Sequence, residues 1–185
     1  FFSSGDFFPH FGYSERFELQ NDQIRKKYGL GPKTQIPALE NRSAWETNSV
    51  DPAAGWITFE TIISTNTDQL GIAPGNLERR WIKDGRQYAH YKMDQPMMPY
   101  FAYLSGKWLV KQDIRKNVPI EIYYDKKHDF NIDRMVSTAK RSLDYYSEQF
   151  GPYPYKQLRI AEFPRYRKLA QSFANMIPYS EAMGF

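Results

Sequence analysis

The residues that could carry chemistry are few, and their spacing forms no complete catalytic set. None of the three histidines, His10, His90 and His128, has a second histidine three or four positions away. A zinc-binding helix needs that spacing, so these residues by themselves predict no metal site. The absence of cysteine excludes disulfides, thiolate metal ligands and cysteine nucleophiles. The sequence also lacks the G-x-S-x-G nucleophile turn and the G-x-G-x-x-G and Walker phosphate loops.

Two glutamates stand where a strand end could place them in a cleft. Glu162 lies at the end of a predicted strand, and Glu181 follows a Tyr-Ser step further along the chain. A surface position is the simpler interpretation of each. His128 follows two lysines, which favours a solvated loop, and His90 lies in a strand-like run, which favours a packed or surface role over a ligand role.

The composition describes a chain with enough apolar and aromatic residues for a folded core. Its 185 residues are 41% hydrophobic and 17% aromatic, and rings at that density are typical of strands rather than of disordered tails. No run approaches the roughly 20 apolar residues that a membrane-spanning helix needs. The formal net charge of +4 comes from 25 basic and 21 acidic residues in short, scattered clusters. A nucleic-acid partner is therefore not expected, because it would favour a longer basic stripe.

Hydrophobic periodicity predicts several strands and one long helix. Alternating apolar residues over 118–124 predict a strand, and apolar residues spaced by three and four positions predict a helix over 132–150. Asn131 is the expected N-cap of that helix, and a Gly-Pro step ends it. An Asp-Gly step at 84–85, between two strand-like runs, predicts a type I′ hairpin. The remaining predicted elements are a short helix at 22–28, capped by Asn21 and ended by Gly29, and strands at 56–65, 77–83, 86–93, 100–104, 107–114 and 157–163.

The order of these elements predicts two parts with different architectures. Hairpins dominate up to about residue 115, and a strand–helix–strand order follows. A domain boundary is therefore expected near 115–117. The expected regions are an irregular segment with a short helix at 1–55, strands at 56–116, and a strand–helix–strand unit at 117–185.

The last third of the sequence resembles the opening of the catalytic domain of M1-family zinc aminopeptidases. The resemblance rests on N-V-P-I-E-I-Y-Y at 117–124, on the amphipathic helix, and on F-G-P-Y-P-Y-K-Q-L-R-I-A-E-F-P at 150–164. In the family a G-A-M-E-N loop and a strand ending near I-T-Y-R-E follow, and I-P-Y-S-E at 177–181 resembles that strand. Segments 8–13 and 25–30, together with P-Y-P-Y at 152–155, carry a narrower likeness to M1-like domains fused to bacterial ABC-transporter permeases.

The resemblance implies a fold class, a cofactor and candidate site residues. The implied fold is α+β and β-rich: part of a β-sandwich-like N-terminal domain, followed by the first βαβ unit of a thermolysin-like catalytic domain. The family binds zinc through an H-E-x-x-H helix and a downstream Glu, neither of which this sequence contains. Zinc is therefore expected in the intact parent, and no metal ligand or catalytic residue is expected in this chain. The expected substrate-binding residues, at and after the G-A-M-E-N position, are Gln171, Ser172, Phe173, Tyr179 and Glu181.

Two functions of different classes follow from the resemblance. The chain is expected to be a fragment of an M1-like zinc metallopeptidase domain that is inactive alone. The alternative, which ranks second, is a non-catalytic peptide or protein interaction module of a membrane transporter. One observation supports it: Ser172 replaces the family Glu that binds the substrate's amine. An independent all-β carbohydrate or peptide binder is a third, weaker interpretation. The implied partners are the rest of the parent polypeptide, a peptide substrate and a membrane permease domain, and the implied location is extracytoplasmic, in the periplasm or at the cell surface.

Overall fold

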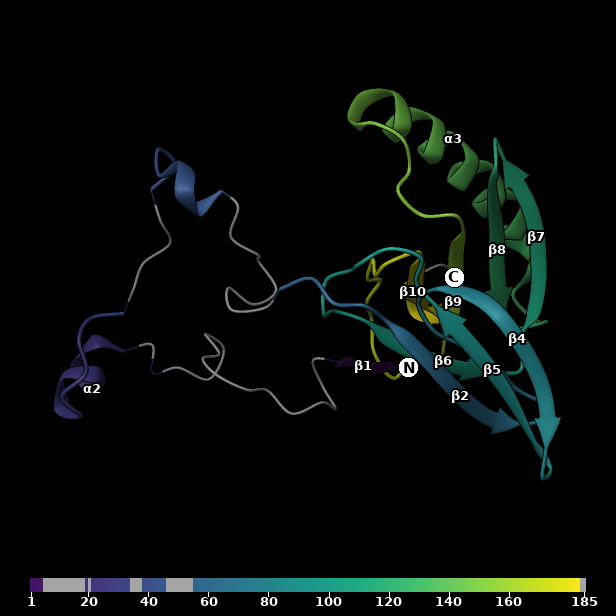
Figure 1. The fold of residues 1–185 in the computed structure, drawn as a ribbon, viewed down its shortest axis with the longest axis horizontal. Coiled ribbons are helices and arrows are strands. Elements are labelled where there is room, and N and C mark those ends of the chain that lie inside the picture. Colours follow the sequence, from purple (N-terminus) through teal and green to yellow (C-terminus); the bar gives the residue numbers. More distant parts are fainter. Residues whose placement is uncertain (5–18, 20, 34–37, 46–54, 184–185) are drawn as a thin grey trace.

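The strands form three sheets in the part of the chain that the structure describes. The structure is a computed structural model, and it describes residues 1–4, 19, 21–33, 38–45 and 55–183. Two sheets are antiparallel, with the orders β1-β6-β3 and β2-β5-β4, and the third has the order β10-β9-β8-β7 (Figure 1). The architecture is the expected α+β, β-rich one. The bounds are β1 (Phe2–Ser3), α2 (Asp22–Lys27), η2 (Arg42–Ala44), β2 (Glu60–Asn66), β3 (Leu70–Ile72), β4 (Asn76–Lys83), β5 (Arg86–Lys92), β6 (Ala102–Gly106), β7 (Leu109–Arg115), β8 (Val118–Tyr124), η3 (Asp129–Asn131), α3 (Ile132–Phe150), β9 (Leu158–Phe163), β10 (Met176–Ser180) and η4 (Glu181–Met183).

The turn and cap predictions are confirmed in position at three places, although one of the predicted caps makes no side-chain hydrogen bond. Asp84 and Gly85 have φ angles of 48° and 69°, the pair of positive values that a type I′ hairpin requires. Asn21 caps α2, because its side chain accepts hydrogen bonds from two backbone N–H groups of the first turn, and Gly29 follows the helix with a φ of 69°. Asn131 makes no side-chain cap bond to α3. It is itself in a helical conformation, because the turn η3 leads directly into the helix.

The four-stranded sheet contains the predicted strand–helix–strand unit. β7 and β8 form an antiparallel hairpin through Lys116, at a φ of 44°, whereas β8, β9 and β10 run parallel to one another. α3 is the crossover that connects the parallel strands β8 and β9. The expected boundary at 115–117 falls in the β7–β8 hairpin, so β7 shares a sheet with the strands that follow it. The carboxyl ends of β8, β9 and β10 meet at one edge, where the loops after them converge.

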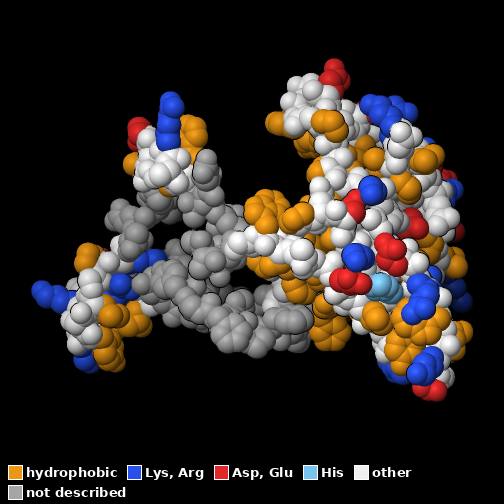
Figure 2. Space-filling view, in the orientation of Figure 1, with side chains coloured by type: hydrophobic (Ala, Val, Ile, Leu, Met, Phe, Trp, Pro, Cys, Tyr) orange, Lys and Arg blue, Asp and Glu red, His pale blue; other side chains and the backbone are white. Residues whose placement is uncertain are grey.

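α3 spans the predicted residues, but its apolar stripe is only partly covered. α3 packs on β7 and β8, and three residues of its N-terminal half, Ile132, Val136 and Ala139, are buried in a cluster with apolar residues of β8 and β9. Tyr146 and Phe150, in the C-terminal half, are 58% and 80% exposed. Figure 2 shows hydrophobic side chains at the surface of this end of the helix. The hydrophobic face of α3 therefore extends beyond the part of the sheet that it covers.

Buried polar contacts join the four-stranded sheet to the antiparallel strands. Arg159 of β9 is 1% exposed, and its Nη1 donates to the carbonyl oxygens of Gly75 at 2.7 Å and Ala73 at 3.3 Å, in the turn after β3. Its guanidinium carbon lies 5.1 Å from the centre of the Tyr91 ring on β5. Asn175 accepts a hydrogen bond from the N–H of Gly75 and donates one to its carbonyl, both at 3.3 Å. These bonds fix the start of β10 against the rest of the molecule.

Candidate functional site

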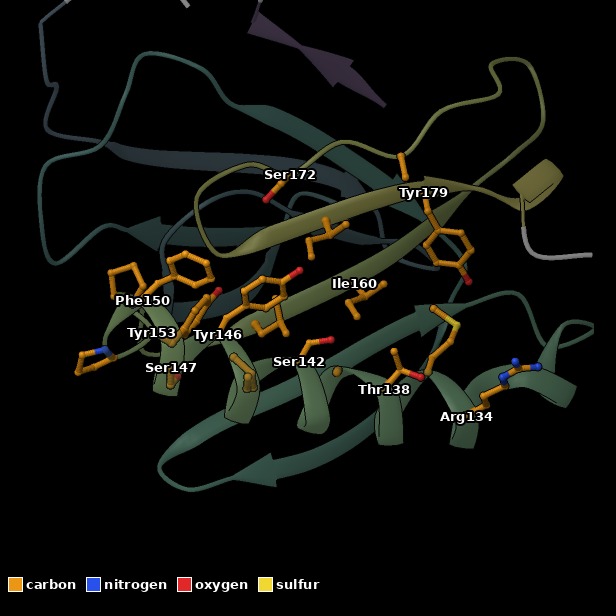
Figure 3. Close-up of a pocket in the computed structure, with 18 of the residues that line it drawn as sticks. Arg134, Thr138, Ser142, Tyr146, Ser147, Phe150, Tyr153, Ile160, Ser172 and Tyr179 are labelled. Carbon is orange, nitrogen blue, oxygen red and sulfur yellow. The ribbon is translucent and has the colours of Figure 1, made fainter. Parts of the chain in front are cut away.

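An apolar groove lies between α3 and the uncovered faces of β9 and β10. Its volume is about 1180 Å³. α3 lines it along its whole length, with residues spaced three and four apart over 131–150, and the strands contribute Ile160, Ile177 and Tyr179. Figure 3 shows Tyr146 on the helix facing Ile160 across the groove. The groove exists because α3 packs over β7 and β8 and leaves the other half of the sheet open on this side.

The lining of the groove suits an apolar or helical ligand better than an ionic one. Among the lining residues in the described part of the chain, Arg134 carries the one charged side chain. Hydroxyl groups from Thr138, Ser142 and Ser147 lie along α3 and could accept or donate single hydrogen bonds. An ammonium group in this groove would find no carboxylate among these residues.

A hairpin at 169–176 forms the rim of the groove. Its first arm runs antiparallel to β10, with the N–H of Gln171 donating to the carbonyl of Pro178 at 3.1 Å. The second arm is the start of β10, which follows a two-residue turn that ends at Asn175. Asn175 has a φ of 51°, and its side chain is hydrogen-bonded to the backbone of Gly75. Ser172 is thus placed on a segment that is hydrogen-bonded to a central part of the fold.

The five expected site residues separate into four groups. Ser172 and Tyr179 both line the groove (Figure 3). Gln171 lies next to Ser172 and donates to its carbonyl oxygen at 3.1 Å. Phe173 packs in the core against other aromatic rings, because alternate residues of an extended segment face opposite sides. Glu181 lies beyond the end of β10 in a separate polar cluster, and substrate binding by any of the five stays a prediction.

This polar cluster occupies the carboxyl edge of the parallel strands. His128 comes from the loop after β8, Glu162 from β9 and Glu181 from η4, and their side-chain N and O atoms lie within 4.8 Å of one another. His128 Nδ1 and Glu162 Oε1 are 2.7 Å apart, and the Tyr179 hydroxyl donates to Glu162 Oε2 at 3.2 Å. Arg165 donates to Glu181 Oε1 from its backbone N–H and from Nε, both at 3.1 Å.

Burial decides the electrostatics of the cluster. Glu162 is 3% exposed, and its two oxygens are each hydrogen-bonded to a side chain. Burial raises the pKa of the Tyr179 phenol above its ordinary value, and the adjacent Glu162 carboxylate raises it further. Partial burial would raise the pKa of Glu181, but the hydrogen bonds from Arg165 outweigh that effect and hold the pKa below its usual range. At neutral pH Tyr179 is therefore a hydrogen-bond donor and Glu181 an anion.

The sequence-based expectations for His128 and Glu162 are wrong. His128 is half-buried rather than in a solvated loop, and Glu162 is buried rather than at the surface. The reason is the topology, since the α3 crossover brings the end of β9 beside the loop after β8, 34 residues earlier in the chain. No local motif signals such a pair. The expectation for His90 is confirmed, because it lies at the sheet surface with Nε2 2.7 Å from Glu60 Oε1.

Solved structures of M1 zinc metallopeptidases share this architecture. A mutant of the M1 zinc metallopeptidase from Deinococcus radiodurans, bound to a Tyr-Ser-Ala substrate, matches with a TM-score of 0.58 over 70% of this chain at 14% identity. The M1 zinc metallopeptidase of the same organism without that mutation gives a TM-score of 0.57 over 68% of this chain at 15% identity. This chain has the fold of part of an M1 zinc metallopeptidase.

The likeness is one of fold and covers part of the M1 enzymes. The match spans 31% and 30% of the two Deinococcus radiodurans chains. No profile of a known sequence family matches this chain, and no curated protein does. In the described residues, no helix combines the length and the apolar character needed to cross a membrane.

This chain lacks the residues through which M1 enzymes bind their catalytic zinc. The sequence has no H-E-x-x-H motif, and its three histidines are far apart. Within the described ranges, one group of three His, Asp or Glu side chains is close enough to share an ion, namely His128, Glu162 and Glu181. This group contains one histidine from a loop instead of two from a helix, so it is not the metal site that the resemblance implies.

Proposed function

We propose that this chain is part of an M1-like zinc metallopeptidase domain and forms one wall of its substrate cleft. The observation that carries the proposal is the match to M1 enzymes over 70% of the chain, and the groove between α3 and the sheet supplies the wall. In the intact protein, zinc held by residues absent from this sequence would polarise the scissile carbonyl and activate water. The role of this chain is to position the peptide along the rim hairpin and to exclude water from the apolar groove.

Ser172 has a specific role in this proposal. In the family, a Glu at this position binds the free amine of the substrate, and here a hydroxyl is exposed at the rim. Losing a hydrogen bond to a charged group costs about 1.5–3 kcal/mol, which is a factor of roughly 10–150 in affinity. A parent enzyme with Ser172 is therefore expected to bind free amino termini weakly, or to act on peptides without relying on that charge.

The test compares the intact parent polypeptide with the 185-residue chain. Zinc-dependent release of the N-terminal residue from a tripeptide is expected from the parent and not from this chain alone. Ser172→Glu in the parent is expected to lower KM for substrates with a free amine roughly 10- to 100-fold, with little change for N-acetylated peptides. A parent that contains no H-E-x-x-H, or that cleaves no peptide when loaded with zinc, would contradict the proposal.

A non-catalytic interaction module is the second candidate, and a specific observation favours it. The groove offers no carboxylate among the described lining residues, so it lacks the group that would bind a peptide amine. Under this alternative the M1 fold of a transporter-associated protein holds a peptide or a partner helix by its apolar side chains. The partners would be a membrane permease domain and the rest of the polypeptide, outside the cytoplasm. A parent that binds peptides but does not cleave them would support this candidate.

A further inference from the structure

The cluster at the carboxyl edge of β8, β9 and β10 has the composition of a metal site that the M1 likeness does not assign. We propose that His128, Glu162 and Glu181 bind one zinc ion, separate from the catalytic zinc of M1 enzymes. Three observations carry this proposal: the donor set, the convergence of the donors, and the placement of their supporting groups. It does not depend on the proposed function.

The donor set is one imidazole and two carboxylates. Zinc is commonly bound by His nitrogen and Glu or Asp oxygen, and three protein ligands with an open fourth position are a frequent arrangement. Calcium and magnesium prefer sites made of oxygen alone, so the imidazole of His128 favours zinc over both. The two carboxylates also supply the charge to neutralise a divalent ion, in a protein whose formal net charge is +4.

The donor atoms are close to the positions that zinc requires. Zinc–N and zinc–O distances of about 2.0–2.2 Å place the ligand atoms of a tetrahedral site about 3.4 Å apart. In the structure these atoms lie within 4.8 Å of one another, and they come from three segments that are anchored at strand ends. Small side-chain rotations therefore bring the three donors to one ion. The fourth position would be taken by water.

Supporting groups hold two of the three ligands in place. The Tyr179 hydroxyl donates to Glu162 Oε2, which leaves Oε1 directed at His128. The backbone N–H of Arg165 donates to Glu181 Oε1, and the Arg165 side chain, 71% exposed, can swing into solvent when an ion neutralises the carboxylate. Such outer contacts orient ligands and raise metal affinity.

Zinc binding replaces one hydrogen bond. His128 Nδ1 and Glu162 Oε1 lie 2.7 Å apart, within hydrogen-bond distance, and the ring donates this bond when Nδ1 carries its proton. A zinc ion at Nδ1 needs the lone pair of that nitrogen, so the ring proton moves to Nε2, or is released to water if the ring was doubly protonated. Both carboxylates bind as anions. The product is an uncharged assembly of Zn²⁺, two carboxylates and a neutral imidazole, with water in the fourth position.

The test is equilibrium dialysis of the purified 185-residue chain against zinc, with metal content measured by mass spectrometry. One zinc per chain is expected, and cobalt in its place is expected to give the visible absorption of a tetrahedral site. His128→Gln and Glu181→Gln are expected to weaken zinc binding at least about tenfold. The fold of each variant is compared with that of the unsubstituted 185-residue chain by circular dichroism. Because the two substitutions alter separate segments, a single variant that folds is enough to decide whether the cluster binds zinc.

The matched control is the surface pair of His90 and Glu60. It has the same 2.7 Å contact between a histidine nitrogen and a carboxylate oxygen, but no second carboxylate beside it in the described structure. His90→Gln is therefore expected to leave zinc binding unchanged. The proposal is overturned if the chain binds no zinc at about 100 μM free metal, or if His90→Gln weakens binding as much as His128→Gln does. Neither result would bear on the M1-like cleft, which lacks these ligands.

Discussion

Arg159 provides the sharpest test of how the two parts of this fold are joined. Its side chain is 2% exposed and crosses from β9 to the turn after β3, where Nη1 donates to the carbonyls of Gly75 and Ala73. Nη2 donates to Gln157 Oε1, and Nε lies 3.4 Å from Glu121 Oε2. Arg159→Met keeps much of the volume and removes every one of these donors.

The loss in the free energy of unfolding that we expect from Arg159→Met depends on the polar groups that lose their hydrogen-bond partner. Removing one member of a buried ion pair costs about 3–5 kcal/mol, because the remaining polar groups stay desolvated. Gly75 O keeps the bond from Asn175, and Glu121 keeps those from Gln112 and Tyr123, which argues for the lower half of this range. About 3–4 kcal/mol is a large share of the roughly 5–15 kcal/mol that stabilises a typical domain. For a chain of this length it corresponds to about 6–16 °C in Tm.

The assay is urea unfolding, followed by tryptophan fluorescence and by circular dichroism, with Arg115→Met as the matched control. Arg115 also bonds a carboxylate, that of Asp144, but at the surface, so its loss is expected to change the unfolding midpoint little. Arg159→Met should lower the midpoint strongly and separate the two probes, because the sheets no longer unfold together. Equal effects of the two variants would refute the idea that Arg159 joins the sheets.

Three further outcomes are expected. Gly75→Ala should lower the urea midpoint of unfolding far more than Gly85→Ala does. Both residues have positive φ, so backbone strain is common to the two variants. A Cβ at Gly75 would lie 2.6 Å from the Lys92 carbonyl carbon, whereas one at Gly85 would meet nothing within 4 Å. Tm should fall as the pH drops below about 4, and it should fall less in high salt. The reason is that the fold lowers the pKa of five carboxyl groups, whose stabilising contribution is lost when they are protonated. These groups belong to Glu60, Asp94, Asp113, Asp144 and Glu181. Absorbance at alkaline pH should show that some tyrosines ionise only when the chain unfolds, because burial raises the pKa of Tyr123 and Tyr153. The free energy of unfolding should therefore fall above a pH of about 10, where tyrosines of the unfolded chain ionise. Full ionisation of the native chain at that pH would contradict the burial of these two rings.

The elements with a strong local signal could be predicted from the sequence. α3 begins and ends at the predicted residues, because its apolar spacing and its Gly-Pro end are properties of the helix itself. The β4–β5 hairpin followed from Asp-Gly for the same reason. β3 has three residues and was not predicted, since so short a strand exists only by pairing with β6. Much of the expected irregular segment at 1–55, and the whole of the likeness at 8–13, lies outside the described residues.

The candidate site was predictable only in part. The M1 resemblance names Ser172 and Tyr179 as substrate-binding residues, and both line the groove, whereas their binding of a substrate stays a prediction. The resemblance also names Phe173, although the alternation of an extended segment turns that ring into the core. The likeness to M1 enzymes in three dimensions supports the expected fold, whereas the permease partner and the extracytoplasmic location stay predictions.

The sequence by itself determined the identity and extent of the long helix, the hairpin turn, the β-rich class and the absence of cysteine chemistry. These are consequences of composition and of spacing over a few residues. Only the tertiary structure decided that the C-terminal part of the apolar face of α3 stays exposed, that Arg159 is a buried connection, and that His128, Glu162 and Glu181 meet. The physical reason is that parallel strands joined by a crossover bring together residues that are tens of positions apart, and no local pattern records which strand ends become neighbours.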